Sequence, residues 1–178
     1  MRIIKDKIAL SAAVLASGII LVSIMAPLIS PYDPLSIDLD SLRMPPSFQH
    51  LLGTDNKGRD VLSRIIYGAR VSLSVAVIAT VVSMSIGLSL GLLSGYIGGK
   101  TDAAITMLID VVMAFPSLLL AIGISAVLPP GLYTVIIALG VVGWASFARL
   151  MRATVLTIKG LPYVESARAL GCSGCRVA

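Results

Sequence analysis

The sequence is poor in the residues from which most metal and redox sites are built. It holds one histidine, His50, and two cysteines, Cys172 and Cys175. Two cysteines exclude a disulfide framework of any size. Their C-x-x-C spacing suits zinc or redox chemistry, but zinc would need two more ligands and no thioredoxin-like strand–helix pattern surrounds the pair. We therefore expect no metal site and no cofactor, and we interpret His50 as a plain loop residue.

Charged residues are also scarce. They make up 13% of the 178 residues, against 57% hydrophobic residues and a mean hydropathy of +0.97. Soluble domains carry about 25% charged residues, and here the apolar residues form long blocks, which favours a membrane protein over a soluble protein with a large core. The net charge is +5, but the basic residues lie mostly beside apolar blocks. We interpret them as topology determinants and expect a lipid bilayer, not nucleic acid, as the partner.

Four apolar blocks are candidates for membrane-spanning helices, because a bilayer core of about 30 Å needs about 20 helical residues. They cover residues 8–29, 72–97, 103–128 and 132–150. The first block follows a basic start; a cleaved signal peptide is the alternative, but the block is long for a signal-peptide core. The basic residues predict a cytoplasmic N-terminus, although the external loop between the first two blocks also carries five. The sequence thus predicts an all-α, multi-pass protein of about four spans.

Two domains are expected: residues 1–58, with the first span and a polar external loop, and residues 59–178, with the remaining spans.

The segment "RDVLSRIIYGARVSL" has apolar residues on one helical side and polar residues on the other. It predicts an amphipathic helix on the external (periplasmic) side, lying on the membrane surface or packed on its own protein. Gly87 and Gly91 have the spacing of closely packed membrane helices, and "GGKTD" predicts a tight polar turn.

Asp110 and Pro116 stand out within the third apolar block. An acid inside a span is a functional hypothesis by default, but Asp110 lies about two turns from the end of its block. It therefore has either a structural role at the interface or a role lining a pathway. Pro116 should kink its helix, which either shapes a cavity or merely accommodates packing.

The sequence does not indicate an enzyme. It has no Ser-His-Asp set, no paired catalytic carboxylates and no phosphate-binding glycine-rich loop. If ATP is used, another chain must bind it.

The stretch "LPYVESARALG" predicts a short helix near the chain end, because Pro162 suits a first turn and Gly171 suits a helix end. Tyr163, Ser166, Ala167 and Leu170 share one face, and Glu165 and Arg168 are spaced to pair on the other. The stretch is either a compact knob for a partner or a frayed tail.

"ESARALG" resembles the EAA-type loop of ATP-binding-cassette importer permeases, with Glu165, Ala167 and Gly171 matching and Ser166 in place of an alanine. "LLGTDNKGRDVLSRIIYGARVSLSV", "APLISPYDP" and "DVVMAFPSLLLA" resemble segments of dipeptide, oligopeptide and nickel permeases. The resemblance implies a type I importer permease of the bacterial or archaeal inner membrane. It also implies two cytoplasmic ATP-binding subunits, a second permease subunit and an external solute-binding protein. The helix around Tyr163, Glu165, Ser166, Ala167, Arg168 and Gly171 would be the coupling helix seated on an ATP-binding subunit.

The family pattern continues into two further spans, which are not in this sequence. We therefore expect an incomplete form of the permease fold, shortened at its C-terminus. Three hypotheses remain: a permease subunit for peptides or nickel, a remnant that only docks on the ATPase or sister permease, and an independent small channel. The sequence does not select the solute.

Overall fold

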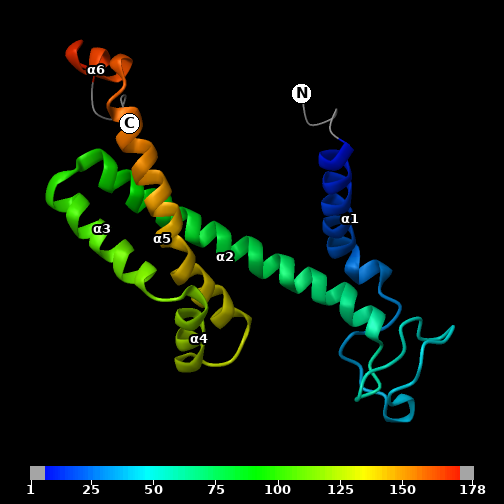
Figure 1. Cartoon of the computed structure of the whole chain (residues 1–178). Helices are drawn as coiled ribbons and strands as arrows, with labels where there is room; N and C mark the ends of the chain where they lie inside the picture. Colours follow the sequence, from blue (N-terminus) through cyan, green and yellow to red (C-terminus); the bar gives the residue numbers. More distant parts are fainter. Residues whose placement is uncertain (1–6, 173–178) are drawn as a thin grey trace. The chain divides into compact units, whose positions relative to one another are not determined.

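The computed structural model describes residues 7–172, and within them every side chain except those of Glu165, Ala167 and Arg168. The elements are α1 (Lys7–Ile29), the 3-10 helix η2 (Leu39–Ser41), α2 (Val61–Ile97), α3 (Gly99–Ala114), α4 (Ser117–Val127), α5 (Leu132–Lys159) and α6 (Pro162–Ala169) (Figure 1). In this described range the only β pairing is one isolated bridge between Thr54 and Asp60. The all-α prediction is therefore confirmed.

The number of spans depends on how α3 and α4 are counted. α1, α2 and α5 are each long and apolar enough to cross a membrane. α3 and α4 pass the same test together, but they meet at an angle of 89°. The structure thus has three spans in its described part, or four if the bent pair is one span, in agreement with the prediction of about four.

The chain divides into an N-terminal unit, Met1–Ser74, and a C-terminal unit, Val75–Ala178. The predicted domains, residues 1–58 and 59–178, stay a prediction. We describe the two units separately.

The predicted separate amphipathic helix is not observed as an element of its own, because residues 61–97 form one helix, α2, of 37 residues. No proline interrupts this range, and Gly68 alone does not break a helix that its neighbours favour. Burial also does not follow the predicted apolar and polar sides of the segment. Asp60 and Ser63 are buried, whereas Ile65 on the predicted apolar side is 57% exposed.

The N-terminal unit holds a loop that is organised around two aspartates. The Asp55 carboxylate accepts hydrogen bonds from the backbone N–H of Lys57 and from the backbone and side chain of Arg59, and it pairs with Arg64. Asp60 caps the start of α2, because its Oδ2 accepts the N–H and the hydroxyl of Ser63 at 2.8 and 2.7 Å. These carboxylates fix the path by which the chain enters α2.

His50 was expected to be a plain loop residue, and this interpretation is wrong. Its Nδ1 lies 3.0 Å from Oδ1 of Asp60, and its ring packs on Tyr32 at 4.8 Å between centroids. His50 therefore links the loop to the capped start of α2.

Acidification should loosen this loop. Burial alone would raise the pKa of Asp60, but hydrogen bonds from Ser63 and His50 outweigh it and hold the pKa below its ordinary value. Burial would likewise raise the pKa of Asp55, yet hydrogen bonds from Arg59 and its neighbours hold it well below. Such groups stabilise the fold above their unfolded pKa of about 3.9, and this stabilisation is lost as the pH falls through the folded pKa. We expect amide exchange in the loop, corrected for its intrinsic rate, to quicken only below about pH 4.

The Asp60→Asn variant should show part of this loosening already at neutral pH, because it lacks one of the titrating groups. Asp33→Asn is the matched control, since within residues 7–172 that carboxylate accepts only the local N–H of Leu35. Corrected exchange that is the same at neutral and acid pH would contradict the prediction.

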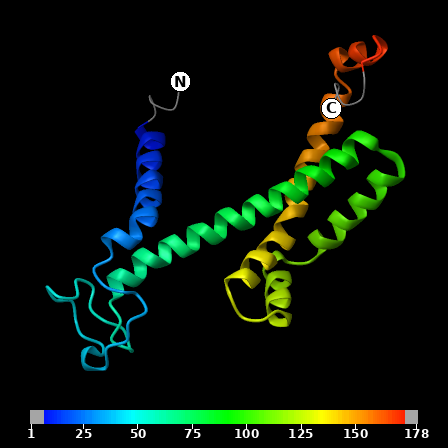
Figure 2. The same cartoon turned by 180° about the vertical axis from the view of Figure 1, so that it is seen from behind.

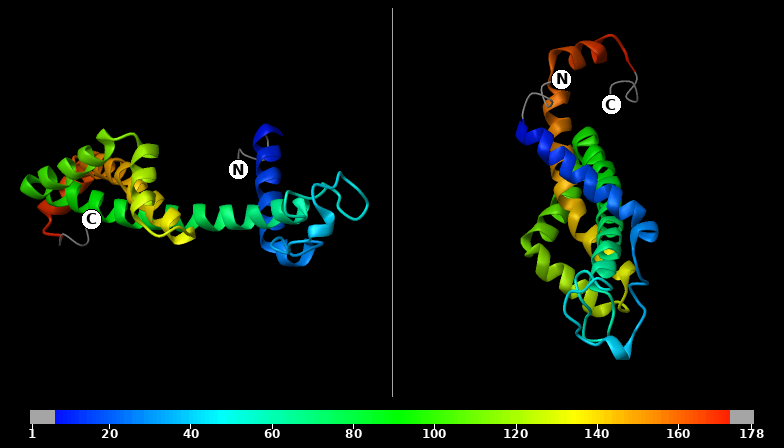
Figure 3. Two further views of the ribbon diagram at one scale, coloured as in Figure 1. Left: turned by 90° about the horizontal axis from the view of Figure 1, so that it is seen from below. Right: turned by 90° about the vertical axis from the view of Figure 1, so that its right-hand side faces the viewer.

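In the C-terminal unit, α2 and α5 cross (Figures 2 and 3) and approach closely at glycines of α2. An added Cβ at Gly87 would lie 2.5 Å from the Trp144 carbonyl oxygen, and one at Gly91 would lie 2.4 Å from that of Ala148. The spacing of Gly87 and Gly91 therefore serves a contact within the chain. Gly95 extends the contact by a further turn to Val155.

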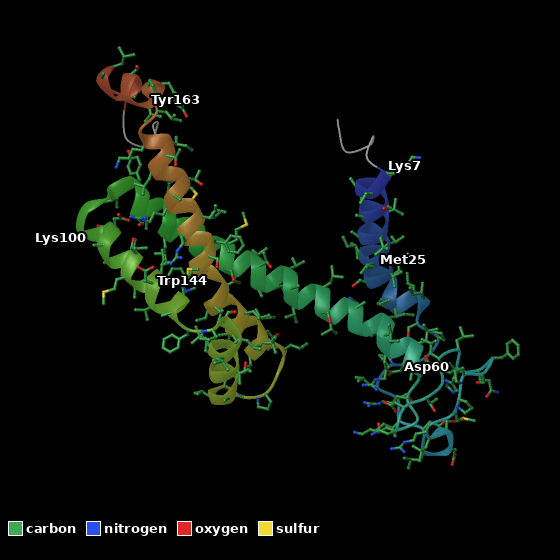
Figure 4. All side chains as sticks on the ribbon, in the orientation of Figure 1. Lys7, Met25, Asp60, Lys100, Trp144 and Tyr163 are labelled. Carbon is green, nitrogen blue, oxygen red and sulfur yellow. The ribbon has the colours of Figure 1, made fainter. Side chains whose placement is uncertain are left out.

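A small apolar core joins α3 to α5 beside this contact. Its buried members are Ile105 and Ile109 of α3 and Ala145 and Ala148 of α5, with Trp144 packed against them. Trp144 is labelled on α5 in Figure 4. The core and the glycine contact together hold α2, α3 and α5 of this unit.

Candidate functional site

The short helix α6 follows directly after the end of α5 and packs on it (Figure 1). Among its described side chains, Val164 is the buried one at 6% exposure, whereas Tyr163 is 65% exposed. Gly171 has φ of 79°, the left-handed conformation that ends helices and favours glycine. α6 is therefore anchored at one residue and exposes the rest of its described surface.

The predicted helix is present at nearly the predicted bounds, and the structure shows which of its described residues are buried. Tyr163, Ser166 and Leu170 of the predicted shared face are exposed, and Val164 is buried. The side chains of Glu165, Ala167 and Arg168 lie outside the described part, and so does the predicted pairing of Glu165 with Arg168. The role of these residues in binding another subunit stays a prediction.

A network of polar side chains, which we call the Asp102 clasp, joins three helices close to α6. It consists of Ser94 of α2, Asp102 and Thr106 of α3, and Arg152 of α5. Arg152 donates from Nε and Nη2 to the two carboxylate oxygens of Asp102 at 2.5 and 2.7 Å. The Ser94 hydroxyl donates to the same carboxylate, and Thr106 Oγ1 lies 3.4 Å from it. The bidentate geometry makes this a strong, directional contact.

Lys159 adds a second tie at this end of the unit. Its Nζ donates to the backbone oxygen of Tyr96 at 2.9 Å. Tyr96 lies in the last turn of α2, where carbonyl groups have no partner within the helix. The end of α5 that carries α6 is thus fixed to the ends of both α2 and α3.

Asp110 forms an ion pair that the sequence did not predict. Nη2 of Arg149 in α5 lies 2.9 Å from its Oδ1. The Arg149 and Asp110 side chains are 54% and 62% exposed, in contrast to 30% and 21% for Arg152 and Asp102. The structure therefore has two ion pairs between α3 and α5. We call the less exposed pair, Arg152–Asp102, the inner pair and the more exposed pair, Arg149–Asp110, the outer pair.

The expected kink at Pro116 is a complete break. α3 ends at Ala114 and α4 begins at Ser117, with the 89° bend between them. Proline has no N–H to continue the helix, and its ring clashes with the preceding turn. Whether this break shapes a cavity for function stays a prediction.

The turn predicted for "GGKTD" is shorter than expected. Gly98 and Gly99 have φ of 72° and 57° and make the turn, while Lys100 lies within the first turn of α3. Asp102 therefore lies in the first turn of α3, where it contacts Arg152. The sequence contained a signal for this position, because an aspartate is favoured in the first turn of a helix.

The remaining candidate residues are the two cysteines, of which the structure describes one. Cys172 is a half-buried free thiol, and Cys175 lies outside the described residues. Over residues 7–172, no group of three or more His, Cys, Asp or Glu side chains could hold a metal ion.

Comparison with known proteins gives two family matches. Residues 87–178 match the family described as the binding-protein-dependent transport system inner membrane component. Residues 1–46 match the N-terminal transmembrane domain of oligopeptide transport permease C.

Similar curated proteins extend over nearly the whole chain. The oligopeptide transport system permease protein of Bacillus subtilis is 39% identical over 177 residues, which are 99% of this chain and 58% of that protein. The dipeptide permease protein of the same organism is 36% identical over 99% of this chain and 55% of its own length. A glutathione transport system permease protein of Shigella flexneri is 44% identical over 97% of this chain and 57% of its own length. The chain thus spans somewhat more than half the length of these relatives.

Proposed function

Because this chain belongs to the family of binding-protein-dependent transport system inner membrane components, we propose that it acts as a permease subunit of an ATP-driven importer of small peptides. The observation that carries the proposal is α6, a short exposed helix that follows the end of α5. That end of α5 is fixed to α3 and α2 by polar contacts. In this proposal α6 is the coupling helix, which transmits movement of an ATP-binding subunit to the spans.

The contacts around α6 support this role, because a coupling element must transmit force without bending at its base. Val164 is buried, and α6 contacts α5. The Asp102 clasp and the Lys159–Tyr96 contact then tie α5 to α3 and α2. A push on α6 would therefore move α5 together with the ends of two further helices.

Peptides are the solutes that the relatives favour. The three relatives described above are named for oligopeptides, dipeptides and glutathione, which is itself a small peptide. Nickel, the other solute expected from the sequence, remains the second solute to test.

The proposed assembly has the partners that the sequence resemblance implied. They are cytoplasmic ATP-binding subunits, a second permease subunit and an external solute-binding protein, assembled in the inner membrane. We place the N-terminus and α6 in the cytoplasm and the loop of the N-terminal unit outside, as the distribution of basic residues predicts.

The exposed ring of Tyr163 should carry part of the binding energy for an ATP-binding subunit, because aromatic side chains dominate many interfaces. We expect Tyr163→Ala to weaken this binding by about tenfold or more, and Glu165→Lys to abolish it. The measurement is capture of the ATP-binding subunits of a peptide importer from the same cell by the full chain in lipid nanodiscs. Thr157→Ala is a matched control, since the hydroxyl of this exposed residue of α5 donates to the Ala153 carbonyl oxygen of its own helix.

Two outcomes distinguish the hypotheses. Association together with peptide uptake in proteoliposomes containing all the partners supports the permease proposal, whereas association without uptake supports the docking-only alternative. The permease proposal would be overturned if neither Tyr163→Ala nor Glu165→Lys changed the capture of the ATP-binding subunits.

A further inference from the structure

The outer ion pair of the C-terminal unit lies deep within its helices. Asp110 is 11 residues beyond Gly99, the first residue of α3, or about 16 Å at 1.5 Å per residue. Arg149 is 10 residues before Lys159, the last residue of α5, or about 15 Å. Basic side chains lie at both ends, Lys100 (labelled in Figure 4) and Lys159. With those ends at the membrane surface, the pair lies near the middle of a hydrocarbon core of about 30 Å.

An ion pair at this depth is not expected to face lipid. More than half of each side chain of the pair is exposed, and charged groups inside a membrane usually face protein or a water-filled cavity. The exposed apolar residue Leu108 lies two positions from Asp110 on the same helix, which places it on the opposite side. α3 therefore has one side suited to lipid and another that is not.

Polar residues recur along one side of α3, and this side is hollowed. Asp102, Thr106 and Asp110 are spaced at every fourth residue, so they share one side of the helix. Together with Arg152 they line an open cavity of about 570 Å³, whose wall also includes the apolar residues Ala103, Met107, Val111 and Ala114. The cavity runs beside the Asp102 clasp toward the outer pair.

We propose that this polar side of α3, with Arg149 of α5, lines a water-filled vestibule of the transport route and contacts the charged groups of the solute there. The proposal rests on the permease function proposed above. It also names the class of solute, a zwitterion with one ammonium and one carboxylate group, as in a free peptide.

The pair can exchange partners with such a solute without leaving a charge uncompensated. The ammonium group would bind the carboxylate of Asp110, and the carboxylate group would bind the guanidinium of Arg149. One ion pair is replaced by two, so each charge has a partner both before and after the exchange. A solute with a single charge would leave one partner unpaired.

Accessibility to a charged thiol reagent tests the vestibule without requiring transport. In the full chain with Cys172 and Cys175 replaced by serine, we would place one cysteine at Asp110, Thr106 or Leu108. Membrane vesicles of both orientations would then be treated with a membrane-impermeant methanethiosulfonate. We expect Asp110→Cys and Thr106→Cys to react about tenfold faster or more than Leu108→Cys, because only water-exposed thiols react. Thr106→Cys keeps both ion pairs, so it serves if Asp110→Cys does not fold.

Failure of the vestibule and failure of the permease function give different results in this experiment. Equal, slow reaction of all three cysteines would overturn the vestibule but leave coupling through α6 intact. Equal, fast reaction would mean that α3 is not in the membrane, which would overturn both.

A second measurement tests the solute class. Asp110→Asn should lower uptake of a free dipeptide by about tenfold and should reduce the preference for it over its N-acetylated form. An unchanged preference would overturn the zwitterion part of the proposal.

Discussion

Replacing Gly91 by leucine is expected to force α2 and α5 apart and to cost about 3 kcal/mol or more. The first added atom already meets the carbonyl oxygen of Ala148 at 2.4 Å and Cβ of Met151 at 2.7 Å. A backbone oxygen in a helix cannot rotate away as a flexible side chain can, so the helices must separate. The measurement is unfolding of the purified chain in detergent or bicelles, followed by the fluorescence of Trp144, the single tryptophan, which packs beside this contact.

Gly68→Leu is the matched control, because it makes the same change in the same helix. Among the described residues, nothing lies within 4 Å of a Cβ added at Gly68. We expect this variant to change the free energy of unfolding by less than about 1 kcal/mol. Equal losses from the two variants would show that the glycine contact does not determine stability.

Asp102→Ala is expected to destabilise the C-terminal unit by about 2 kcal/mol, because it removes both charge-assisted hydrogen bonds to the partly buried guanidinium of Arg152. Arg152 and Asp102 are only 30% and 21% exposed. The loss should also weaken capture of the ATP-binding subunits, since the base of α6 loses its tie to α3.

A double-mutant cycle with Arg152→Ala isolates the pair itself, because removing both charges should cost less than the sum of the single losses. Asp110→Ala is the comparison, since its pair with Arg149 is more than half exposed and such pairs contribute about 1 kcal/mol or less. Strictly additive losses for Asp102→Ala and Arg152→Ala would contradict a direct interaction.

Local sequence signals predicted most of the individual helices. Hydropathy and length placed α1 and α5, the helix break follows from Pro116, and α6 lies between Pro162 and Gly171, which favour a helix start and end. Each of these signals acts over a few neighbouring residues, so a single chain suffices to read it.

Contacts between distant residues could not be predicted in the same way. Arg152 meets Asp102 across 50 positions of sequence, and periodicity within either segment does not show which opposite charge will face it. The link between His50 and Asp60 likewise depends on how the loop folds. The continuity of α2 was missed because an amphipathic pattern and a following apolar run look like two elements, although the backbone needs no break between them.

The break at Pro116 has an electrical consequence. The peptide dipoles of a helix sum to about half a positive charge at its N-terminus and half a negative charge at its C-terminus. The C-terminus of α3 at Ala114 and the N-terminus of α4 at Ser117 are only two residues apart, so poles of opposite sign meet at the bend. Their fields largely cancel, which allows a broken helix to lie in a medium of low dielectric constant. Any movement that drew the two ends apart would uncover both poles, so the macrodipoles act as a restoring force on the bend.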